Sequence, residues 1–477
     1  MASRMRDFGR APLRRSGMRT AALVVVVIGL LAIAGASGVA RASGPGTAIG
    51  YGSTWAYTSS TPAAGWMNPG FDASSWATDT APFSDRTSVY CAGPYGTAGL
   101  PTTANTDFPV YSTLFLRNTF ALPADAWGLH LTGTIDNNAS VWVNGTSYPG
   151  ASGGSCSTGD INVDVPSASL TRGATSDLVA VQASDSGVAT YFALQATYGA
   201  IAFGNQPVET QKNSPITDGS GPIRVTITPP AGGAAVPDGT EVDLSLQAIS
   251  GSGTISGGTA HTSGGVATFR GLAVSAPGEY RLVATSGGAS VTGNAFVIAD
   301  QVTTCPAGQT CTSTGGSTSN TQVTASSSFT SGNQLAVSVI DGGAGIPAGV
   351  CPGFVPQGAG SFINILGGVV GGGNITATWT LAKSLVMAAG NPGAAHFDIC
   401  LGAENLAGGT TPWTTKSGAP STPVYDSNLG ATLYWGLLPD CPKTPTGPCI
   451  LHRDKNQANE VVTFYLPYPW DAGFHGG

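Results

Sequence analysis

The chain has 477 residues, of which only 9% are charged, whereas 69 are glycine and 32 are proline. Residues 1–42 hold seven of the 19 Lys and Arg and one of the 26 Asp and Glu, which leaves 12 basic against 25 acidic residues, a net charge of −13, in the rest of the chain. Such a surface lacks the Lys and Arg that neutralise phosphates, so we expect no nucleic-acid partner and no adhesion to anionic membranes.

Residues 1–42 have the pattern of a secretory signal peptide. A stretch rich in arginine precedes an apolar run over residues 21–38, and Ala40-Arg41-Ala42 follows as a small-residue cleavage site. We therefore expect cleavage after Ala42 and a secreted, extracellular or cell-envelope protein. The alternative is an uncleaved signal anchor, because the apolar run approaches the ~20 residues that span a bilayer. A membrane is expected as a partner only in that case.

The rest of the chain has the periodicity of strands. Apolar and polar residues alternate in segments such as 129–132 and 224–228, and clusters of Gly, Pro and Asn separate them at short intervals. No amphipathic helix is evident beyond the N-terminal segment, and the length favours about three domains. We predict an all-β protein of three tandem β-sandwich domains after the signal peptide, with boundaries at 43–204, 205–300 and 301–477.

Ordered aromatic and turn motifs run through the first predicted domain. They are Trp66, Phe71-Asp72, Trp76, Ala81-Pro82-Phe83, Phe115-Leu116-Arg117-Asn118-Thr119-Phe120, Asp136-Asn137 and Val141-Trp142-Val143-Asn144-Gly145. Their order resembles the galactose-binding-domain-like jelly roll, the β-sandwich that serves as a sugar-binding accessory module in family 2 glycoside hydrolases. The resemblance implies a jelly roll over residues 43–204 and a carbohydrate ligand.

Sugar binding by such a sandwich needs an aromatic face for the apolar side of the ring and amide or carboxylate groups for its hydroxyls. The candidate ligand-binding residues of these types are Trp66, Asp72, Trp76, Asp136, Asn137 and Asn144. The alternative interpretation is structural, with the tryptophans in the core and the Asp and Asn residues closing turns. Some related modules hold a structural calcium ion, but the chain has no dense run of aspartates, so we expect no metal and no cofactor.

Residues 205–300 resemble bacterial immunoglobulin-like domains of the invasin and adhesin type. The resemblance rests on Asp238-Gly239-Thr240 and on residues 264–269 and 277–284. It implies a sandwich whose role is that of a spacer. Within it, we expect Tyr280 to pack near the end of the core with its hydroxyl hydrogen-bonded to the backbone.

Residues 301–477 contain several expected strands and most of the cysteines. The expected strands are 334–340, 375–381, 397–401, 431–437 and 461–466. A stretch rich in Thr, Ser and Gly, residues 312–320, is expected to form a flexible loop. Through Pro448-Cys449-Ile450, Arg453 and Lys455, the region resembles uncharacterised cysteine-bearing β-modules of secreted actinobacterial proteins, a resemblance that implies no known activity.

The cysteines form an even set without any C-x-x-C pair, which on an exported chain indicates disulfides. The set is Cys91, Cys156, Cys305, Cys311, Cys351, Cys400, Cys441 and Cys449. Only two precede residue 300, so we expect Cys91 to pair with Cys156. For the other six, sequence proximity favours the pairs Cys305–Cys311 and Cys441–Cys449. Cys351 and Cys400 then form the last pair, in one of fifteen connectivities.

No motif indicates catalysis. The histidines are scattered singly without the spacing of a zinc site, and no segment has the βα alternation of a catalytic barrel. We therefore expect a protein that is not an enzyme and that binds a glycan. The alternatives are a structural or adhesive envelope protein that binds other surface proteins, and an enzyme with an unrecognised site in residues 301–477. Two carboxylates roughly 5–10 Å apart in a cleft of that region would favour the enzyme.

Overall fold

The computed structural model describes sixteen segments of the chain. They are residues 43–85, 104–154, 158–173, 176–187, 189–249, 251–318, 321–328, 333–341, 349–351, 361–367, 374–382, 399–405, 411–426, 431–455, 459–467 and 470–476. The expected signal peptide, Cys91 and Cys156 lie outside these residues. Every regular element in the described segments is a β-strand, apart from one turn of 3-10 helix, η1 (Ser167–Ser169), which confirms the all-β fold class. None of the described helical structure is long and apolar enough to cross a membrane.

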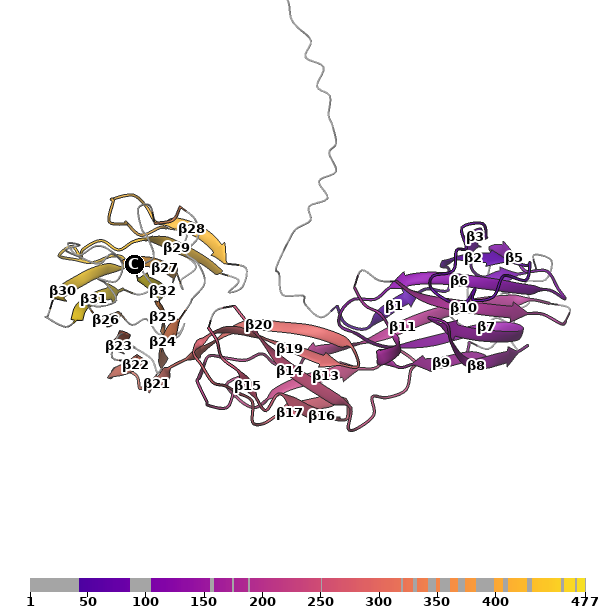
Figure 1. Ribbon diagram of the computed structural model, residues 1–477, viewed down its shortest axis with the longest axis horizontal. Helices are drawn as coiled ribbons and strands as arrows, with labels where there is room; N and C mark the ends of the chain where they lie inside the picture. The colour runs from indigo at the N-terminus through magenta and orange to yellow at the C-terminus, as the bar shows by residue number, and fades with distance from the viewer. Residues whose placement is uncertain are drawn as a thin grey trace, which may run out of the picture. The chain divides into compact units, whose positions relative to one another are not determined.

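The first sandwich is built from eleven strands (Figure 1). They are β1 (Gly46–Ile49), β2 (Thr54–Thr58), β3 (Ala77–Thr80), β4 (Phe83–Ser84), β5 (Thr106–Asp107), β6 (Thr113–Ala121), β7 (Ala126–Val143), β8 (Thr146–Gly153), β9 (Ile161–Val165), β10 (Ser176–Ser184) and β11 (Tyr191–Phe203). One layer has the order β3-β2-β6-β10-β7-β8. The other has the order β5-β4-β11-β7-β9, and β1 also pairs with β11.

Strand β7 belongs to both layers because it changes partners along its length. Its first part, up to Asp136, pairs with β11, whereas the part from Asn137 onward pairs with β8 and β10. The change falls at the peptide bond between Asp136 and Asn137, which is cis. These two polar residues therefore lie where the two layers meet.

Alternation of side chains along the strands fills the space between the layers. On β10, Val179, Val181 and Ala183 point into a buried hydrophobic cluster, and on β7 the same cluster receives Leu129 and Leu131. Successive residues of a strand face opposite sides of the sheet, so the intervening residues lie on the outer faces. On β10 these include Leu178 and Ala180, which pack against Trp66 and Phe115 in a second, smaller cluster.

Residues 205–300 form a second set of strands around a core that also includes Ile201 of β11, and the end of β11 pairs with β13. They are β12 (Thr210–Gln211), β13 (Ile223–Thr228), β14 (Glu241–Ala248), β15 (Ile255–Ser256), β16 (Thr259–Ser263), β17 (Val266–Phe269), β18 (Ala273–Val274), β19 (Gly278–Ser286) and β20 (Ala289–Ala299). Tyr280 is fully buried in this core. Its hydroxyl accepts a hydrogen bond from the N–H of Gly253 (2.9 Å) and lies 3.1 Å from the carbonyl oxygens of Ala276 and Pro277, which confirms the expected backbone contact.

The remaining strands form two sheets. They are β21 (Gln301–Cys305), β22 (Thr310–Thr318), β23 (Thr321–Ser328), β24 (Asn333–Asp341), β25 (Ser361–Gly367), β26 (Ile375–Ala382), β27 (Ile399–Asn405), β28 (Thr422–Asp426), β29 (Ala431–Leu437), β30 (Cys449–Lys455), β31 (Asn459–Leu466) and β32 (Trp470–Gly476). One sheet has the order β21-β24-β25-β32-β27-β29-β28, and the other β22-β23-β26-β31-β30. The five strands expected in this region are confirmed, with ends that differ by zero to four residues.

Three disulfides lie in this region: Cys305–Cys311, Cys351–Cys400 and Cys441–Cys449. These are the three pairs that sequence proximity favours. The flexible loop expected from residue 312 onward was wrong, because residues up to Thr318 belong to β22 and pair with β23. Thr is a good strand former, and alternate residues of β22 such as Cys311 and Ser313 are buried, so composition alone misled the prediction.

Candidate functional site

The segment before β3 covers the outer face of the first layer with aromatic rings. Trp66 is only 6% exposed, and its ring makes edge-to-face contacts with Phe115 (5.2 Å between centroids) and Trp142 (5.3 Å). Trp76, which is half-buried, lies 6.2 Å from Trp66 and packs on Phe71. The Trp66 ring is thus enclosed by other aromatic rings, whereas part of Trp76 is open to solvent.

Arg117 fastens this segment to β6. Its guanidinium donates to the backbone carbonyls of Trp66, Asn68 (3.1 Å) and Phe71 (3.4 Å), and it lies 5.4 Å from the centre of the Phe71 ring. The side chain is buried, and this burial lowers the pKa of the guanidinium from its usual value. A single buried cation therefore binds three backbone carbonyls of the segment before β3, which is called the covering segment below.

Asp72 and Asn144 make local contacts beside the aromatic rings. Asp72 is exposed, and the N–H of Ser74 donates to its Oδ1 (2.9 Å), a hydrogen bond that lowers the pKa of this carboxyl. Asn144 occupies the hairpin turn with a φ of 51°. Its amide donates to the buried Oδ1 of Asp177 (2.6 Å) and accepts from the N–H of Leu178 (2.9 Å), so both ends of the Asn144 amide are used within the fold.

Asp136 and Asn137 lie apart from these residues. They are at the partner change of β7, eight residues before Asn144, a separation on the order of 20 Å along a strand. The structure therefore divides the six candidate residues between two places: Trp66, Asp72, Trp76 and Asn144 lie with the covering segment, and Asp136 and Asn137 at the end of the sandwich. The sequence pattern did not separate these two groups.

Four aspartates gather around the second place and are called the carboxylate cluster below: Asp85, Asp136, Asp160 and Asp185. Each follows, interrupts or precedes a strand. Asp85 follows β4, Asp160 precedes β9 and Asp185 follows β10, while Tyr191 at the start of β11 pairs with both Asp136 and Ser84. Burial raises the pKa of Asp136, and the negative charges of Asp185, Asp160 and Asp85 raise it further.

Asp185 has one carboxylate oxygen that is used by the fold and one that is not. Its Oδ2 accepts hydrogen bonds from the backbone N–H groups of Tyr111 (2.6 Å) and Gly187 (3.2 Å). Its Oδ1 is buried and has no hydrogen-bond donor among the residues that the structure describes, although the whole residue is only 7% exposed. Buried carboxylate oxygens are normally hydrogen-bonded, so a donor from a ligand would complete this group.

Two glycines leave room beside these side chains. A Cβ atom on Gly187 would lie 3.6 Å from Asn137 Oδ1 and 3.8 Å from Asp185 Oδ1, and one on Gly154 would lie 3.7 Å from Asp136 Oδ1. Asn137 itself donates to Asp136 and accepts from the backbone N–H of Ser186 (2.7 Å). Asp136, Asn137 and Asp185 therefore lie around these two glycines.

Tyr111 has an exposed side chain, and its backbone contacts the cluster. It has a φ of 55°, its N–H is held by Asp185, and its side chain is 70% exposed. The sequence-based prediction missed both Tyr111 and Asp185. The available signal was that Tyr111 stands in a loop, before the alternating pattern of β6 begins at Thr113.

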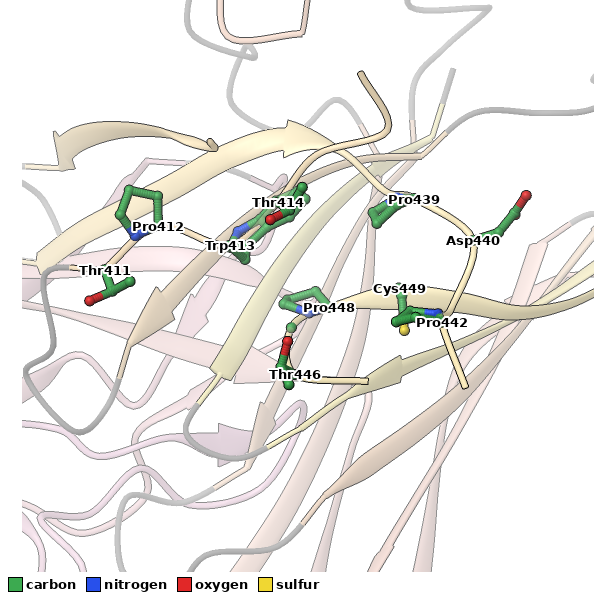
Figure 2. A pocket seen from close by; sticks show the side chains of 11 residues that line it. Thr411, Pro412, Trp413, Thr414, Pro439, Asp440, Pro442, Thr446, Pro448 and Cys449 are labelled. Atoms are coloured by element: carbon green, nitrogen blue, oxygen red, sulfur yellow. The ribbon is translucent and has the colours of Figure 1, made fainter. Parts of the chain in front are cut away.

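A concave region lies in residues 411–449 (Figure 2). Its cavity has a volume of about 610 Å³ and is lined by Pro412, Pro439, Pro442 and Pro448, by threonines, and by Trp413. The indole N–H of Trp413 already donates to the Tyr434 carbonyl (3.1 Å).

One carboxylate, that of Asp440, belongs to the lining, and in Figure 2 it points away from the other lining side chains. The cavity in the described part of the chain therefore does not supply the pair of carboxylates that would mark a glycosidase site.

No group of three or more His, Cys, Asp or Glu side chains among the described residues is arranged to hold a metal ion. The charges of Asp185, Asp160 and Asp85 raise the pKa of Asp136. The chemistry that the cluster offers is hydrogen-bond acceptance and negative charge.

No family model and no curated protein matches the chain. Solved structures that match include the β-glucuronidase of Faecalibacterium prausnitzii (13% identity, TM-score 0.23) and that of Bacteroides uniformis (13%, 0.25). A β-glucuronidase from Ruminococcus gnavus also matches (11%, 0.23). Each match covers 55% of this chain, and the chain spans 47%, 33% and 47% of those structures, respectively, so less than half of each.

The expectation that the protein is not an enzyme is corrected by this comparison, because the matched structures are enzymes. That expectation is withdrawn. With TM-scores of 0.25 and below, the likeness does not assign an activity or a substrate to this chain.

Proposed function

We propose that the protein binds carbohydrate at the carboxylate cluster of its first sandwich. The observation that carries the proposal is the buried Oδ1 of Asp185, which has no donor among the described residues and would lie 3.8 Å from a Cβ atom on Gly187. A sugar hydroxyl is a donor of the right kind, since carboxylates accept hydrogen bonds from the hydroxyls of bound sugars.

Tyr111 supports the same proposal. Carbohydrate sites combine polar groups with an aromatic ring on which the apolar face of the sugar packs. Tyr111 is the exposed aromatic residue whose backbone is joined directly to Asp185, by a 2.6 Å hydrogen bond. Stacking on this ring and hydrogen bonds to Asp185, Asp136 and Asn137 would fix one sugar unit.

We assign the remaining candidate residues a supporting part. Trp66, Asp72, Trp76 and Asn144 hold the covering segment and the β7–β8 turn, away from the ligand. In this proposal they maintain the shape of the first sandwich, and the ligand contacts come from Asp136, Asn137, Asp185 and Tyr111.

The rest of the chain is proposed to present this module outside the cell. Residues 1–42 are the signal peptide, residues 43–204 form the binding domain, 205–300 an immunoglobulin-like spacer and 301–477 a disulfide-bearing β-domain. The disulfides in the last part fit an oxidising, extracellular or cell-envelope setting. A partner on the cell surface, glycan or protein, would then be within reach.

A glycan array probed with the purified full-length protein tests the proposal. We expect binding to a restricted set of glycans. Asp185→Asn and Tyr111→Ala should each raise the Kd at least ~10-fold, as for the loss of a hydrogen bond to a charged group or of a stacking ring. Tyr425→Ala is the matched control, because Tyr425 is 66% exposed but lies on β28.

Gly187→Ala gives a finer test, since the added methyl group would occupy the space beside Asn137 and Asp185 at ordinary contact distance. It should weaken binding and leave the thermal unfolding temperature unchanged. Absence of any glycan above background, or equal loss of binding in the Tyr425→Ala control, would overturn the proposal. If no glycan binds above background, a structural or adhesive role, in which the protein binds other proteins, becomes the better explanation.

A further inference from the structure

Both carboxylate oxygens of Asp125 accept a hydrogen bond from the same residue, Ser43. The backbone N–H of Ser43 donates to Oδ2 and its hydroxyl donates to Oδ1, each at 2.6 Å. Asp125 is only 6% exposed, and none of the Lys and Arg side chains that the structure describes forms an ion pair with it. Carboxylates are rarely buried to this extent without a cation. Among the described residues, this carboxylate therefore lacks a partner of opposite charge.

The loop that carries Asp125 is fixed by main-chain contacts to other strands. It joins β6 to β7, and its Asp125 carbonyl accepts from the N–H of Ile201 (2.9 Å), while the Ala124 carbonyl accepts from the N–H of Ser290 (2.8 Å). The segment that carries Ser43 is held separately, because β1 begins three residues later and pairs with β11. The position of Asp125 and the direction of the N-terminal segment are thus set by different parts of the fold.

Ser43 is also the residue that follows the expected end of the signal peptide, since Ala40-Arg41-Ala42 predicts cleavage after Ala42. Hydrolysis of the Ala42–Ser43 peptide bond by a signal peptidase consumes one water and leaves a carboxyl group on Ala42 and an amino group on Ser43. An α-amino group has an ordinary pKa of about 7.7–8.0, so it takes up a proton at neutral pH. The nitrogen that contacts Asp125 then becomes a cation.

We propose that Asp125 is the binding site for the N-terminus that signal-peptide cleavage creates. The α-ammonium group of Ser43 forms an ion pair with the Asp125 carboxylate, and this pair stabilises the first sandwich only in the cleaved protein. The inference rests on the export part of the proposed function and is independent of carbohydrate binding. In the uncleaved chain the Ser43 nitrogen is an amide, which makes the same contact without a charge of its own, so cleavage adds Coulomb attraction to it.

An ordinary structural contact is the competing explanation. The uncharged amide and the hydroxyl of Ser43 would tie the segment before β1 to the Asp125 loop whether or not the chain is cleaved. The two explanations differ in the charge on one nitrogen atom. Forms of the protein that differ only in that charge therefore distinguish them.

The first measurement identifies the N-terminus of the exported protein. The full chain, residues 1–477, is expressed in a secreting bacterial host, and the purified product is analysed by intact mass and N-terminal sequencing. We expect a chain that begins at Ser43. A product that keeps residues 1–42, or that begins at another residue, would overturn the inference, whereas the glycan array reports on carbohydrate binding separately.

The second measurement compares three forms of the purified protein. They are residues 43–477 with a free α-amino group, the same chain with an acetylated α-amino group, and residues 42–477, in which the Ser43 nitrogen is again an amide. Hydrogen exchange followed by mass spectrometry is measured at neutral pH. We expect the amides of β1 to exchange at least about tenfold more slowly in the first form than in the other two, as for the gain of a bond between charged groups. Equal rates in all three forms would overturn the inference and leave the proposed function standing.

Two matched variants then test Asp125 itself. Asp125→Asn removes the negative charge, so the three forms should exchange alike. Asp107→Asn is the control, because Asp107 is an exposed carboxylate on β5 of the same sandwich, and the free α-amino form should remain the most protected. If the forms still differ after Asp125→Asn, another group binds the N-terminus and the inference fails. If Asp125→Asn does not fold, the comparison of the free and acetylated forms of the parent decides the inference alone.

Discussion

The guanidinium of Arg117 donates a hydrogen bond to the backbone carbonyl of Trp66, 51 residues earlier in the chain. Arg117 extends from the outer face of β6, and Trp66 lies in the segment that crosses this face. The contact fixes the main chain of that segment while the Trp66 ring fills the space between Phe115 and Trp142. One buried cation and one enclosed ring thus hold the covering segment from its two sides.

Replacing Arg117 by methionine should detach this segment without unfolding the core beneath it. The three carbonyls of Trp66, Asn68 and Phe71 would lose a charged donor, at a cost of about 2–4 kcal/mol in the free energy of unfolding. Hydrogen exchange followed by mass spectrometry should show faster exchange confined to residues 60–76. The exposed Arg224 provides the control, since Arg224→Met should leave both measurements unchanged. Uniformly faster exchange across the sandwich would contradict this explanation.

The two tryptophans of the covering segment should respond differently to truncation. Trp66→Ala removes an enclosed ring and should destabilise the first sandwich by roughly 3–5 kcal/mol. Trp76→Ala removes a half-buried ring and should cost about half as much. Urea unfolding monitored by circular dichroism gives both values. If Trp66→Ala unfolds at the parental urea concentration but no longer binds glycan, Trp66 contacts the ligand and its proposed supporting part is wrong.

Many strands of this chain could be predicted from the sequence because alternation of apolar and polar residues is visible within each strand. Alternation in residues 129–132 and 224–228 predicted parts of β7 and β13, and β29 was predicted to the residue. Residues 312–318 were mistaken for a loop, since the low hydrophobicity of β22 hides the fact that its partner strand, β23, supplies the hydrogen bonds. Pairing between strands is a property of the fold and leaves little trace in one strand alone.

The candidate site was only half predictable for a related reason. Asp136 and Asn137 stood out as a pair in the sequence, but their partners Asp185 and Tyr111 lie 49 and 25 residues away. The partner change of β7 and the loop that places Tyr111 N–H on Asp185 bring these residues together. Asn144 had the same residue type as Asn137, yet its amide is occupied by Asp177 and Leu178. Residue type indicated suitable chemistry, and only the topology showed which groups remain available.

The raised pKa of Asp136 gives a pH dependence with a defined sign. Because burial and the neighbouring aspartates raise this pKa above 3.8, the folded protein holds the proton more tightly than the unfolded chain. The stabilising effect of protonation is therefore full below pH 3.8 and is lost as the pH rises through the raised pKa. Asp136→Asn is uncharged at every pH, so it should be more stable than the parent at pH 7 and equally stable near pH 3.5.

Urea unfolding of the parent and of Asp136→Asn at these two pH values measures the difference. Asp72→Asn is a control of opposite sign, since the hydrogen bond from Ser74 lowers the pKa of Asp72 and favours its charged form. That variant should gain nothing at pH 7. A parent protein that is more stable than Asp136→Asn at pH 7 would show that the Asp136 carboxylate is compensated by a cation or donor, against the present explanation.

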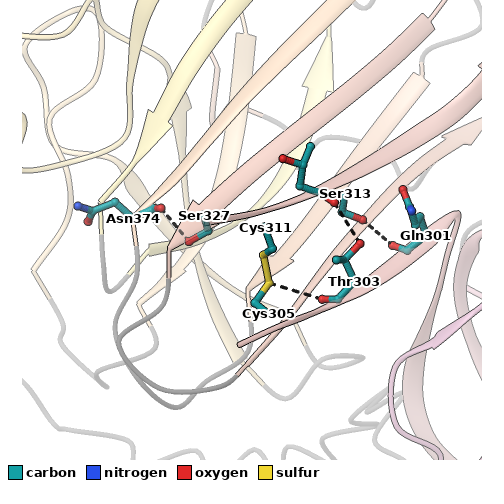
Figure 3. Close-up of a disulfide and its surroundings, with 8 residues drawn as sticks. Gln301, Thr303, Cys305, Cys311, Ser313, Ser327 and Asn374 are labelled. Carbon is teal, nitrogen blue, oxygen red and sulfur yellow. Dashed lines mark hydrogen bonds between the residues drawn. A yellow bond between two sulfur atoms is a disulfide. The ribbon is translucent and has the colours of Figure 1, made fainter. Parts of the chain in front are cut away.

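The disulfides of the last region should differ in their contribution because they close loops of different length. Cys305–Cys311 spans six residues and Cys351–Cys400 spans 49, so the loop-entropy relation gives about 2 and about 4 kcal/mol, respectively. The short disulfide should also contribute less to stability because hydrogen bonds already join β21 and β22 beside it (Figure 3). The hydroxyl of Thr303 donates to the carbonyl of Thr312 (3.2 Å), and the hydroxyl of Ser313 donates to the carbonyl of Gln301 (3.1 Å). Thermal unfolding of the two paired Cys→Ser variants should show the larger loss for Cys351 and Cys400. The reverse order would mean that strain or residual structure in the unfolded chain outweighs loop length.

The buried hydroxyl of Tyr280 should be worth about 1 kcal/mol to the second core, because it accepts a hydrogen bond from the backbone N–H of Gly253. Tyr280→Phe keeps the ring packed against Phe296 and removes only the oxygen that accepts from Gly253 N–H. Urea unfolding should show this loss, and hydrogen exchange should show faster exchange of the Gly253 amide in particular. Tyr425→Phe, which alters an exposed hydroxyl, should change neither. If Tyr280→Phe is as stable as the parent and the Gly253 amide remains protected, that N–H has another acceptor. The Tyr280 hydroxyl then does not stabilise this core through the Gly253 hydrogen bond.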